Sequence, residues 1–283
     1  TYHSTNTLAS LSYTKPEDKL TVLNRDNVTS LSITDNREAP HSSPECVLVI
    51  AASGGIGEAY CKSVLTQFPD IQLIRMARDV EKLTPLTADV LDIEVDLSDD
   101  DSIDNAISAL PKDPPIDWAF IASGWLHDEQ MKPEKTYRNL TRKQFLYSYN
   151  INAVGPAIFI SRLLAKVDKK HPLKIGVLSA RVGSVSDNRL GGWHSYRASK
   201  SALHMLIKNI AIECNNTRKS FIIVGLQPGT TDTALSAPFQ KNLTAAQLQT
   251  PQFTAEHLIR VMSVLEKEDS GKLFDFEGFP FQP

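Results

Sequence analysis

Residues 47–57, Val-Leu-Val-Ile-Ala-Ala-Ser-Gly-Gly-Ile-Gly, join a short apolar run to a glycine-rich turn. The run at 47–50 predicts a buried strand, and residues 58–68 after the turn have the apolar spacing of a helix. A strand that passes through glycines into a helix predicts a phosphate site, because small residues let the backbone approach a pyrophosphate and the helix N-terminus presents free N–H groups. The turn residues expected to contact a bound nucleotide are Ser53, Gly54, Gly55, Ile56 and Gly57.

The chain after this turn repeats the order of strand and helix. Further strands are predicted at residues 72–76, 92–95, 117–122, 174–179, 221–226 and 273–276, and further helices at 145–167, 196–214 and 254–266. Neighbouring parallel strands need a crossover connection, which the intervening helices provide. The sequence therefore predicts an α/β fold, a doubly wound parallel sheet with helices on both faces.

The first 45 residues differ in composition from the rest. They are rich in Ser, Thr and Asn and poor in large apolar residues. Apolar residues at 20–23, a polar run at 24–27 and alternation at 28–33 predict a hairpin; the competing interpretation is a disordered tail. We expect residues 1–45 to be an N-terminal extension, a hairpin or oligomer arm ordered by the body or a neighbouring subunit. Residues 46–283 are expected to form one domain that includes the substrate-binding loops.

Composition argues against several classes of partner. The chain has 30 Lys and Arg against 33 Asp and Glu, a formal net charge of -3, so no nucleic acid or anionic membrane surface is expected. No apolar stretch approaches the roughly 18 residues that span a bilayer, and no secretory leader is expected. Cys46, Cys61 and Cys214 lack the spacing of a disulfide framework or zinc site and indicate buried thiols in a reducing cytoplasm. The run from Ser98 to Asp101 predicts a helix N-cap with acidic residues in the first turn rather than a metal site, and no metal is expected.

Tyr196 and Lys200 lie four residues apart at the start of a predicted helix, so both project from one face. A nearby ammonium favours the phenolate and lowers the pKa of a tyrosine from about 10 toward neutral pH. Such a tyrosine can act as general acid or base. The spacing alone arises often by chance, and the glycine turn upstream makes a catalytic pair the favoured interpretation.

The end of the second predicted strand bears on the choice of nucleotide. Arg78 follows that strand, and no acidic residue stands directly at the strand end, where an NAD-binding protein holds its ribose hydroxyls. Arg78 could instead pair with a 2′-phosphate, the competing interpretation being a surface arginine. NADP (NADPH) is therefore favoured over NAD.

From about residue 46 to the C-terminus, the chain resembles the short-chain dehydrogenase/reductase family, in particular its C-factor-like and carbonyl-reductase-like members. The turn Ala51-x-x-x-Gly55-x-Gly57 is similar to the family's Thr-Gly-x-x-x-Gly-Ile-Gly, residues 152–155 to its Asn-x-x-Gly, and residues 228–233 to its Pro-Gly-x-x-x-Thr. Residues 183–193, which contain Gly-Ser-Val-Ser and Gly-Gly-Trp before Tyr196, resemble the C-factor-like members.

The resemblance implies a Rossmann fold and an NAD(P)-dependent oxidoreductase that acts on the CH–OH or C=O group of a small-molecule alcohol or carbonyl substrate. It implies that Tyr196 transfers the proton, that Lys200 tunes it and binds the nicotinamide ribose, and that Asn152 holds a water in the proton relay. It also places Asp96 and Leu97 at the adenine. The other cofactor contacts that it implies are Ser123, Gly124, Pro228, Gly229, Thr231 and Thr233.

The chain departs from the family at the serine that hydrogen-bonds the substrate oxygen, where it has Ala180. Successive strand side chains point to opposite faces, so Ser179 is not expected to substitute. Ser184, in the following loop, is the expected replacement. Loss of one such donor typically lowers turnover about 10²–10³-fold. Two further departures are residues 121–124, Ile-Ala-Ser-Gly in place of Asn-Asn-Ala-Gly, and Ala51 in place of the first glycine.

We expect NADPH-dependent carbonyl reduction or the reverse alcohol oxidation. The alternative is a cofactor-binding regulatory or cell-signalling protein of the same fold with weak or no turnover, which Ala180 leaves open. In the family, the helices that match residues 145–167 and 196–214 pack against a partner subunit, so a homodimer or homotetramer is expected.

Overall fold

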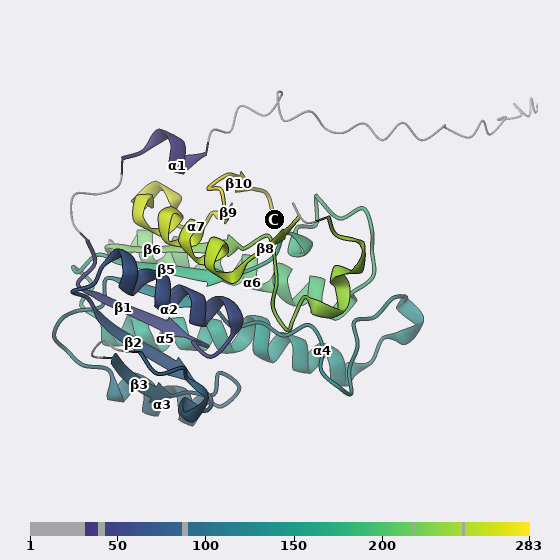
Figure 1. The fold of residues 1–283 in the computed structure, drawn as a ribbon, viewed down its shortest axis with the longest axis horizontal. Coiled ribbons are helices and arrows are strands. Elements are labelled where there is room, and N and C mark those ends of the chain that lie inside the picture. Colours follow the sequence, from purple (N-terminus) through teal and green to yellow (C-terminus); the bar gives the residue numbers. More distant parts are fainter. Residues whose placement is uncertain (1–31, 39–42, 87–89, 218, 245–246) are drawn as a thin grey trace, which may run out of the picture. The chain divides into compact units, whose positions relative to one another are not determined.

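The computed structural model describes residues 32–38, 43–86, 90–217, 219–244 and 247–283. These residues form an eight-stranded sheet in the order β10-β9-β6-β5-β4-β1-β2-β3, and a short pair, β7 with β8 (Figure 1). All strand pairs are parallel except β9 with β10. The strands are β1 (Cys46–Ile50), β2 (Gln72–Ala77), β3 (Val90–Glu94), β4 (Trp118–Ile121), β5 (Leu173–Leu178), β6 (Phe221–Gln227), β7 (Thr230–Thr231), β8 (Leu248–Gln249), β9 (Leu273–Asp275) and β10 (Pro280–Phe281).

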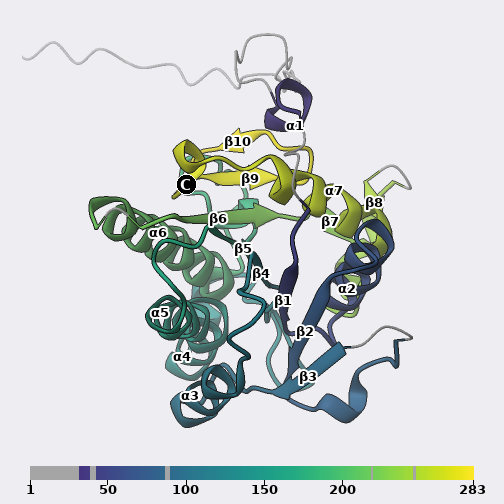
Figure 2. The same cartoon turned by 90° about the vertical axis from the view of Figure 1, so that its left-hand side faces the viewer.

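Helices cover both faces of this sheet, as the sequence predicted. Figure 2 shows α3, α4, α5 and α6 on one side of the sheet and α2 and α7 on the other. Each helical layer packs its apolar residues against one face of the sheet, which gives two buried cores, one on either side of the fully buried central strands β1 and β4. The helices are α1 (Ile33–Asn36), α2 (Gly55–Gln67), α3 (Asp100–Ala109), α4 (Arg142–Tyr149), α5 (Gly155–Lys166), α6 (His194–Asn216) and α7 (Pro251–Val264).

The order of the strands places a crevice between β1 and β4. From β1 the chain moves outward to β2 and β3, and from β4 it moves in the opposite direction to β5 and β6. Connections that leave in opposite directions open a gap at the carboxyl ends of these two strands, which is where doubly wound folds bind ligands. The glycine turn after β1 lies at this point.

Several boundaries differ from the predicted ones. α2 begins at Gly55, because the glycine turn itself supplies its first turn. α7 begins at Pro251 rather than 254, because the side chain of Thr250 caps it by accepting from the backbone N–H of Phe253. The antiparallel β10 was not predicted. The acidic run forms a helix start as predicted, since Asp99 caps α3 through the backbone N–H groups of Asp101 and Ser102. The predicted hairpin lies outside the described residues except for Ser32 and Ile33, and Ile33 opens α1.

The predicted helix over residues 145–167 is interrupted. A π-helix, Asn150–Val154, joins α4 to α5. The close approach of Gly155 to the loop after β3 accompanies this insertion, since a Cβ on Gly155 would lie 2.3 Å from the carbonyl oxygen of Leu97. Short π-helical turns inside α-helices are frequent at functional sites, and this one contains Asn152.

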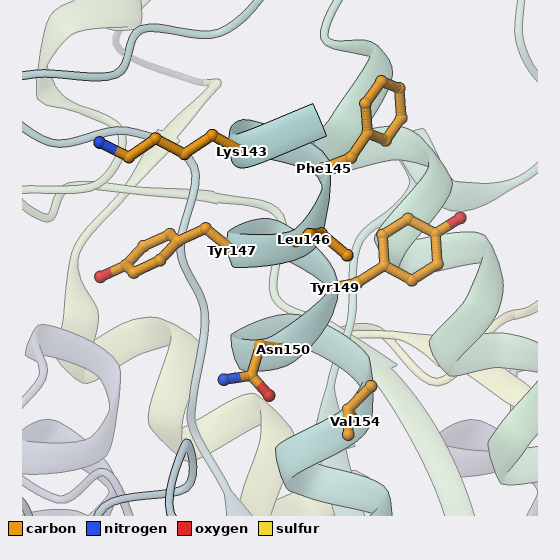
Figure 3. Close-up of a pocket in the computed structure, with 7 residues that line it drawn as sticks. All are labelled: Lys143, Phe145, Leu146, Tyr147, Tyr149, Asn150 and Val154. Atoms are coloured by element: carbon orange, nitrogen blue, oxygen red, sulfur yellow. The ribbon is translucent and has the colours of Figure 1, made fainter. Parts of the chain in front are cut away.

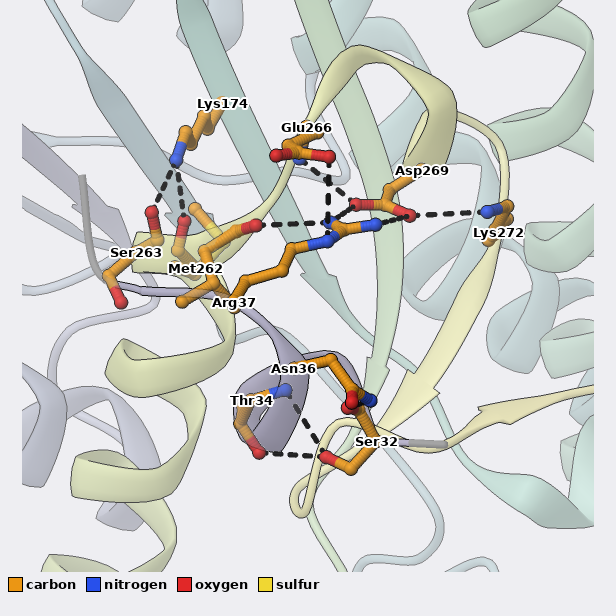
Figure 4. Close-up of polar contacts among 11 residues, drawn as sticks. Ser32, Thr34, Asn36, Arg37, Lys174, Met262, Ser263, Glu266, Asp269 and Lys272 are labelled. Carbon is orange, nitrogen blue, oxygen red and sulfur yellow. Dashed lines mark hydrogen bonds and ion pairs between the residues drawn. The ribbon is translucent and has the colours of Figure 1, made fainter. Parts of the chain in front are cut away.

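Residues Ser32–Arg37 attach the start of the described chain to its C-terminal part (Figure 4). The backbone N–H of Ile33 donates to the carbonyl oxygen of Gly278 over 3.1 Å. The hydroxyl of Thr34 donates to the backbone carbonyl oxygen of Glu277 over 2.9 Å. Arg37 forms an ion pair with the carboxylate of Asp269, whose side chain is fully buried. We call these residues the N-terminal clamp.

Among the residues that the structure describes, no helix is both long and apolar enough to cross a membrane.

Candidate active site

The turn after β1 is closely packed. Ala51 has a φ of 59°, in the left-handed region that destabilises an L side chain by roughly 1–2 kcal/mol. A Cβ on Gly57 would lie 2.4 Å from the carbonyl oxygen of Ala51, so only glycine fits there. Gly54 occupies the N-cap of α2 without a side-chain hydrogen bond. The first backbone N–H groups of α2 can therefore bind an anion.

A first cavity, of about 290 Å³, lies at the carboxyl ends of β1 to β4. Arg78, which follows β2, and Asp96, which follows β3, both line it. Burial opposes ionisation of Asp96, but hydrogen bonds from Ser98 and the charge of Arg78 outweigh it and lower the pKa of Asp96. The predicted cofactor residues that line this cavity are Ser53, Gly54, Arg78, Asp96, Leu97, Ser123 and Gly124.

A second cavity, of about 280 Å³, adjoins the first through Gly54, Ser123 and Gly124. The hydroxyl of Ser123 is buried and has no hydrogen-bond partner among the described residues. Because an unpartnered buried hydroxyl costs about 1–3 kcal/mol, this group suits a ligand that brings its own polar atoms, as a dinucleotide does. The predicted residues that line the second cavity are Gly54, Gly55, Ile56, Ser123, Gly124, Tyr196, Lys200, Pro228 and Thr233.

A third cavity, of about 220 Å³, opens on the other side of Tyr196 and has an apolar, aromatic wall. The ring centroids of Trp193 and Phe239 lie 4.9 Å apart, and those of Trp193 and Tyr196 lie 6.2 Å apart. Tyr196 borders both the second and the third cavity. Two predicted cofactor residues, Gly229 and Thr231, line the third cavity and not the second.

Tyr196 and Lys200 lie on one face of α6, but burial rather than their mutual charge sets their pKa values. Burial raises the pKa of Tyr196 to about 12 and lowers that of Lys200 to about 7. The Lys200 ammonium donates to the carbonyl oxygen of Leu178 over 3.0 Å and lies 5.9 Å from the centre of the Tyr196 ring. The expected lowering of the tyrosine pKa is therefore not found. At neutral pH the phenol therefore carries the proton that a general acid donates.

Asn152 is fully buried in the π-helix, and both polar atoms of its side chain form hydrogen bonds within the protein. Its Oδ1 accepts from the backbone N–H of Trp125 over 2.7 Å, and its Nδ2 donates to the carbonyl oxygen of Trp125 over 2.8 Å. Nδ2 also lies within hydrogen-bond distance of the Ser148 and Ser199 hydroxyls. The side chain thus connects the loop after β4 to α6. The relay role of Asn152 stays a prediction.

Ser184 lies outside the group of residues that line the second and the third cavity. Its hydroxyl is buried, 3.1 Å from the Ser186 hydroxyl, and accepts from the backbone N–H of Asp187 over 3.2 Å. It lines neither the second nor the third cavity, whereas Ala180 lines the third. Its proposed role as a substrate donor stays a prediction that the geometry does not favour.

Sequence reasoning missed a contact between Ser179 and His204. The Ser179 hydroxyl lies 2.6 Å from Nε2 of His204, and both side chains are buried. Because β5 ends at Leu178, the alternation of strand side chains does not extend to Ser179, which lines both the second and the third cavity. The available signal was helical spacing, since residues 196, 200 and 204 fall on one face of α6.

These features define a doubly wound α/β protein that has a tyrosine–lysine pair beside a glycine turn. The model of the short chain dehydrogenase family matches residues 45–244. The chain belongs to this family of oxidoreductases.

Curated relatives include an uncharacterized oxidoreductase of Saccharomyces cerevisiae, 27% identical over 255 residues that cover 84% of this chain and 97% of the relative. The C-signal protein of Myxococcus xanthus is 30% identical over 131 residues, 46% of this chain and 74% of that protein. Among solved structures, NADPH-bound carbonyl reductase from chicken fatty liver has a TM-score of 0.74 at 22% identity, over 84% of this chain and 99% of that one. These structural similarities confirm the Rossmann fold.

Proposed function

We propose that the protein catalyses NADPH-dependent reduction of a carbonyl group, or the reverse oxidation of an alcohol, on a small molecule. The observation that carries this proposal is the position of Tyr196, which borders both the cavity lined by the glycine turn and the aromatic third cavity. When bound, NADPH would supply the hydride. Tyr196 would give the proton to the developing alkoxide in the third cavity.

The other residues hold the reactants. Lys200 would bind the nicotinamide ribose in the second cavity, and Asn152 holds Trp125 in the loop after β4, which also contains Ser123 and Gly124. Arg78 and Asp96 would hold the adenosine half in the first cavity. Aromatic Trp193 and Phe239 would exclude water from the substrate.

The decisive test is a fluorescence titration with NADPH and NADH, followed by a screen of aldehydes, ketones and quinones for NADPH oxidation. Trp125 and Trp193 line the first and third cavities, so both nucleotide and substrate should change the intrinsic emission. NADPH binding with turnover of para-nitrobenzaldehyde or another carbonyl compound is the expected result. The absence of binding to either nucleotide would overturn the proposal.

Arg78 should set the preference for NADPH. A charge-assisted hydrogen bond to a 2′-phosphate contributes about 1.5–3 kcal/mol, so Arg78→Ala should weaken NADPH binding about 10–100-fold. NADH affinity should stay nearly unchanged, because NADH has no 2′-phosphate. Parallel titrations of the variant measure both values, and an equal loss for the two nucleotides would contradict this role.

A second candidate is a cofactor-binding regulatory or signalling protein with weak turnover. Ala180 removes a hydroxyl from the third cavity, and the similarity to the Myxococcus xanthus C-signal protein favours this alternative. It predicts NADPH binding without turnover across the whole carbonyl screen.

The exposed face of α4 supports an oligomer (Figure 3). Phe145, Tyr149 and Val154 project to one side of α4 and the π-helix that continues it, and Lys143 and Tyr147 project to the other. These residues, with Leu146 and Asn150, line an open groove. Leu146 is 65% exposed, and Met205 on the adjacent α6 is 62% exposed, so two neighbouring helices both present large apolar side chains on this face. We assign this face to the contact between subunits of a homodimer or homotetramer.

Leu146→Glu should dissociate that oligomer. An unpaired charge buried in an apolar interface costs several kcal/mol, so the dissociation constant should rise by about 10²-fold or more. Sedimentation velocity over a concentration series measures the change. Leu190→Glu is the matched control, because Leu190 is 90% exposed in the loop before α6. Unchanged association in Leu146→Glu would contradict the assignment.

We also place the protein in the cytoplasm. Cys46, Cys61 and Cys214 are buried free thiols, which suits a reducing compartment.

A further inference from the structure

The serine hydroxyl that the family has at position 180 is absent here. The fold brings another serine, Ser179, between the second and the third cavity. Ser179 and Tyr196 both line the second and the third cavity. The backbone N–H of Ser179 donates to the carbonyl oxygen of Leu226 in β6 over 2.8 Å, which fixes Ser179 at the carboxyl end of the sheet. The hydroxyl of Ser184 instead contacts Ser186 and the backbone N–H of Asp187. Among the described residues, Ser179 is the one serine that lines both the second and the third cavity.

His204 fixes the Ser179 hydroxyl from the side of α6. The two side chains are 3–4% exposed and their polar atoms are 2.6 Å apart. Packing holds the imidazole, because the Phe281 ring lies 6.0 Å away edge to face, and a Cβ on Gly183 would lie 2.8 Å from the ring carbon Cε1. Burial, with the nearby charge of Lys200, lowers the pKa of His204 to about 4. The ring is thus neutral at neutral pH, and one of its nitrogens carries the only ring proton.

The position of that proton decides what Ser179 can do. Nδ1 of His204 is buried and has no partner among the described residues. Proteins leave buried N–H groups unpaired less often than acceptors, which favours the tautomer with the proton on Nε2. In that tautomer Nε2–H donates to the Ser179 oxygen. The Ser179 O–H is then free to donate elsewhere.

We propose that Ser179 donates a hydrogen bond to the substrate carbonyl oxygen in place of the missing residue at 180, and that His204 is the positioning residue that aims it. This inference rests on the proposed carbonyl reduction. Tyr196 delivers the proton, and Ser179 stabilises the negative charge that develops on the same oxygen before the proton arrives.

The test compares kcat for para-nitrobenzaldehyde with NADPH in variants of both residues. Ser179→Ala should lower kcat about 10²–10³-fold while NADPH affinity stays unchanged, and Ser179→Thr should restore part of the loss. Ser186→Ala is the matched control, because Ser186 is exposed on the following loop. Wild-type kcat in Ser179→Ala, with turnover lost in Tyr196→Phe, would overturn the assignment of Ser179 alone. A wild-type protein that binds NADPH but reduces no carbonyl compound would overturn both this inference and the proposed function.

The role of His204 has its own readout. His204→Leu should lower kcat about tenfold, the typical effect of one lost hydrogen bond, and His204→Gln should restore it, because its amide nitrogen can reach the position of Nε2. Nitrogen-15 shifts of the histidine rings, assigned by the signal that His204→Gln removes, should show the neutral Nε2–H tautomer. A proton on Nδ1 would overturn the proposal, since Ser179 would then donate to the imidazole. Circular dichroism and NADPH titration identify a variant that fails to fold.

Discussion

Tyr196→Phe should lower carbonyl reduction by about 10²–10⁴-fold, the range that one general acid contributes. The phenol of Tyr196 is buried with its pKa raised to about 12, so it keeps its proton at neutral pH and can give it to an alkoxide. Phenylalanine retains the ring that packs near Trp193 but has no proton to transfer. The measurement is kcat for para-nitrobenzaldehyde with NADPH, together with NADPH affinity by fluorescence, which should hardly change.

Tyr60→Phe is the matched control for this substitution. Tyr60 is fully buried in α2, stacks on Phe120 with a centroid distance of 4.0 Å, and its hydroxyl has no partner among the described residues. Removal of that hydroxyl should leave activity unchanged, because Tyr60 lines none of the three cavities. Retained activity in Tyr196→Phe would contradict the assignment of the general acid.

Arg37→Leu should lower the free energy of unfolding by about 3 kcal/mol, the lower end of the range for breaking a buried ion pair. The Asp269 carboxylate is fully buried, and Arg37 also donates to the carbonyl oxygen of Val264 over 3.1 Å. Lys272 and the backbone N–H of Glu266 remain as partners of Asp269, which limits the loss. Urea unfolding at neutral pH measures the change.

Arg162→Leu is the control for Arg37→Leu, because Arg162 pairs with Asp104 over 2.8 Å at an exposed site. Such surface pairs contribute about 0–1 kcal/mol. An equal loss in both variants would show that Arg37 does not compensate a buried charge.

The ion pair between Arg37 of the N-terminal clamp and Asp269 should also make the free energy of unfolding depend on pH. Burial opposes ionisation of Asp269, but hydrogen bonds from Arg37, Glu266 and Lys272 outweigh it and lower its pKa below the ordinary 3.8. A carboxyl with a lowered pKa in the folded chain contributes stability at neutral pH, which is lost as the pH falls below 3.8 toward the folded value. This acid-dependent part of the free energy of unfolding should shrink in Arg37→Leu.

Much of the fold could be predicted from short stretches of sequence. The parallel order of strands follows from apolar runs separated by helices, and the predicted runs coincide with β1, β2, β4, β5, β6 and β9 within a few residues. The π-helix and β10 were not predicted. The π-helix depends on the packing around Asn152 and Gly155, and β10 forms only where it meets β9.

Part of the site could also be predicted. The glycine turn, Arg78, Asp96 and the Tyr196–Lys200 pair line adjoining cavities because each stands at the end of a strand or the start of a helix. The pKa direction of Tyr196 could not be predicted, because the helical spacing gives the distance to Lys200 but not the degree of burial. The same limit applied to Ser184, whose hydroxyl is satisfied within its own loop.

By itself, the sequence determined the α/β order of elements and the residues of the glycine turn and the α6 pair, because these depend on spacings of a few residues along one strand or helix. Only the tertiary structure decided which polar groups are buried together. Ser179, just after the carboxyl end of β5, meets His204 of α6, and Arg37 meets Asp269 from opposite ends of the described chain. The physical reason is that desolvation and hydrogen bonding depend on what surrounds a group in space, and that environment is assembled from segments far apart in sequence.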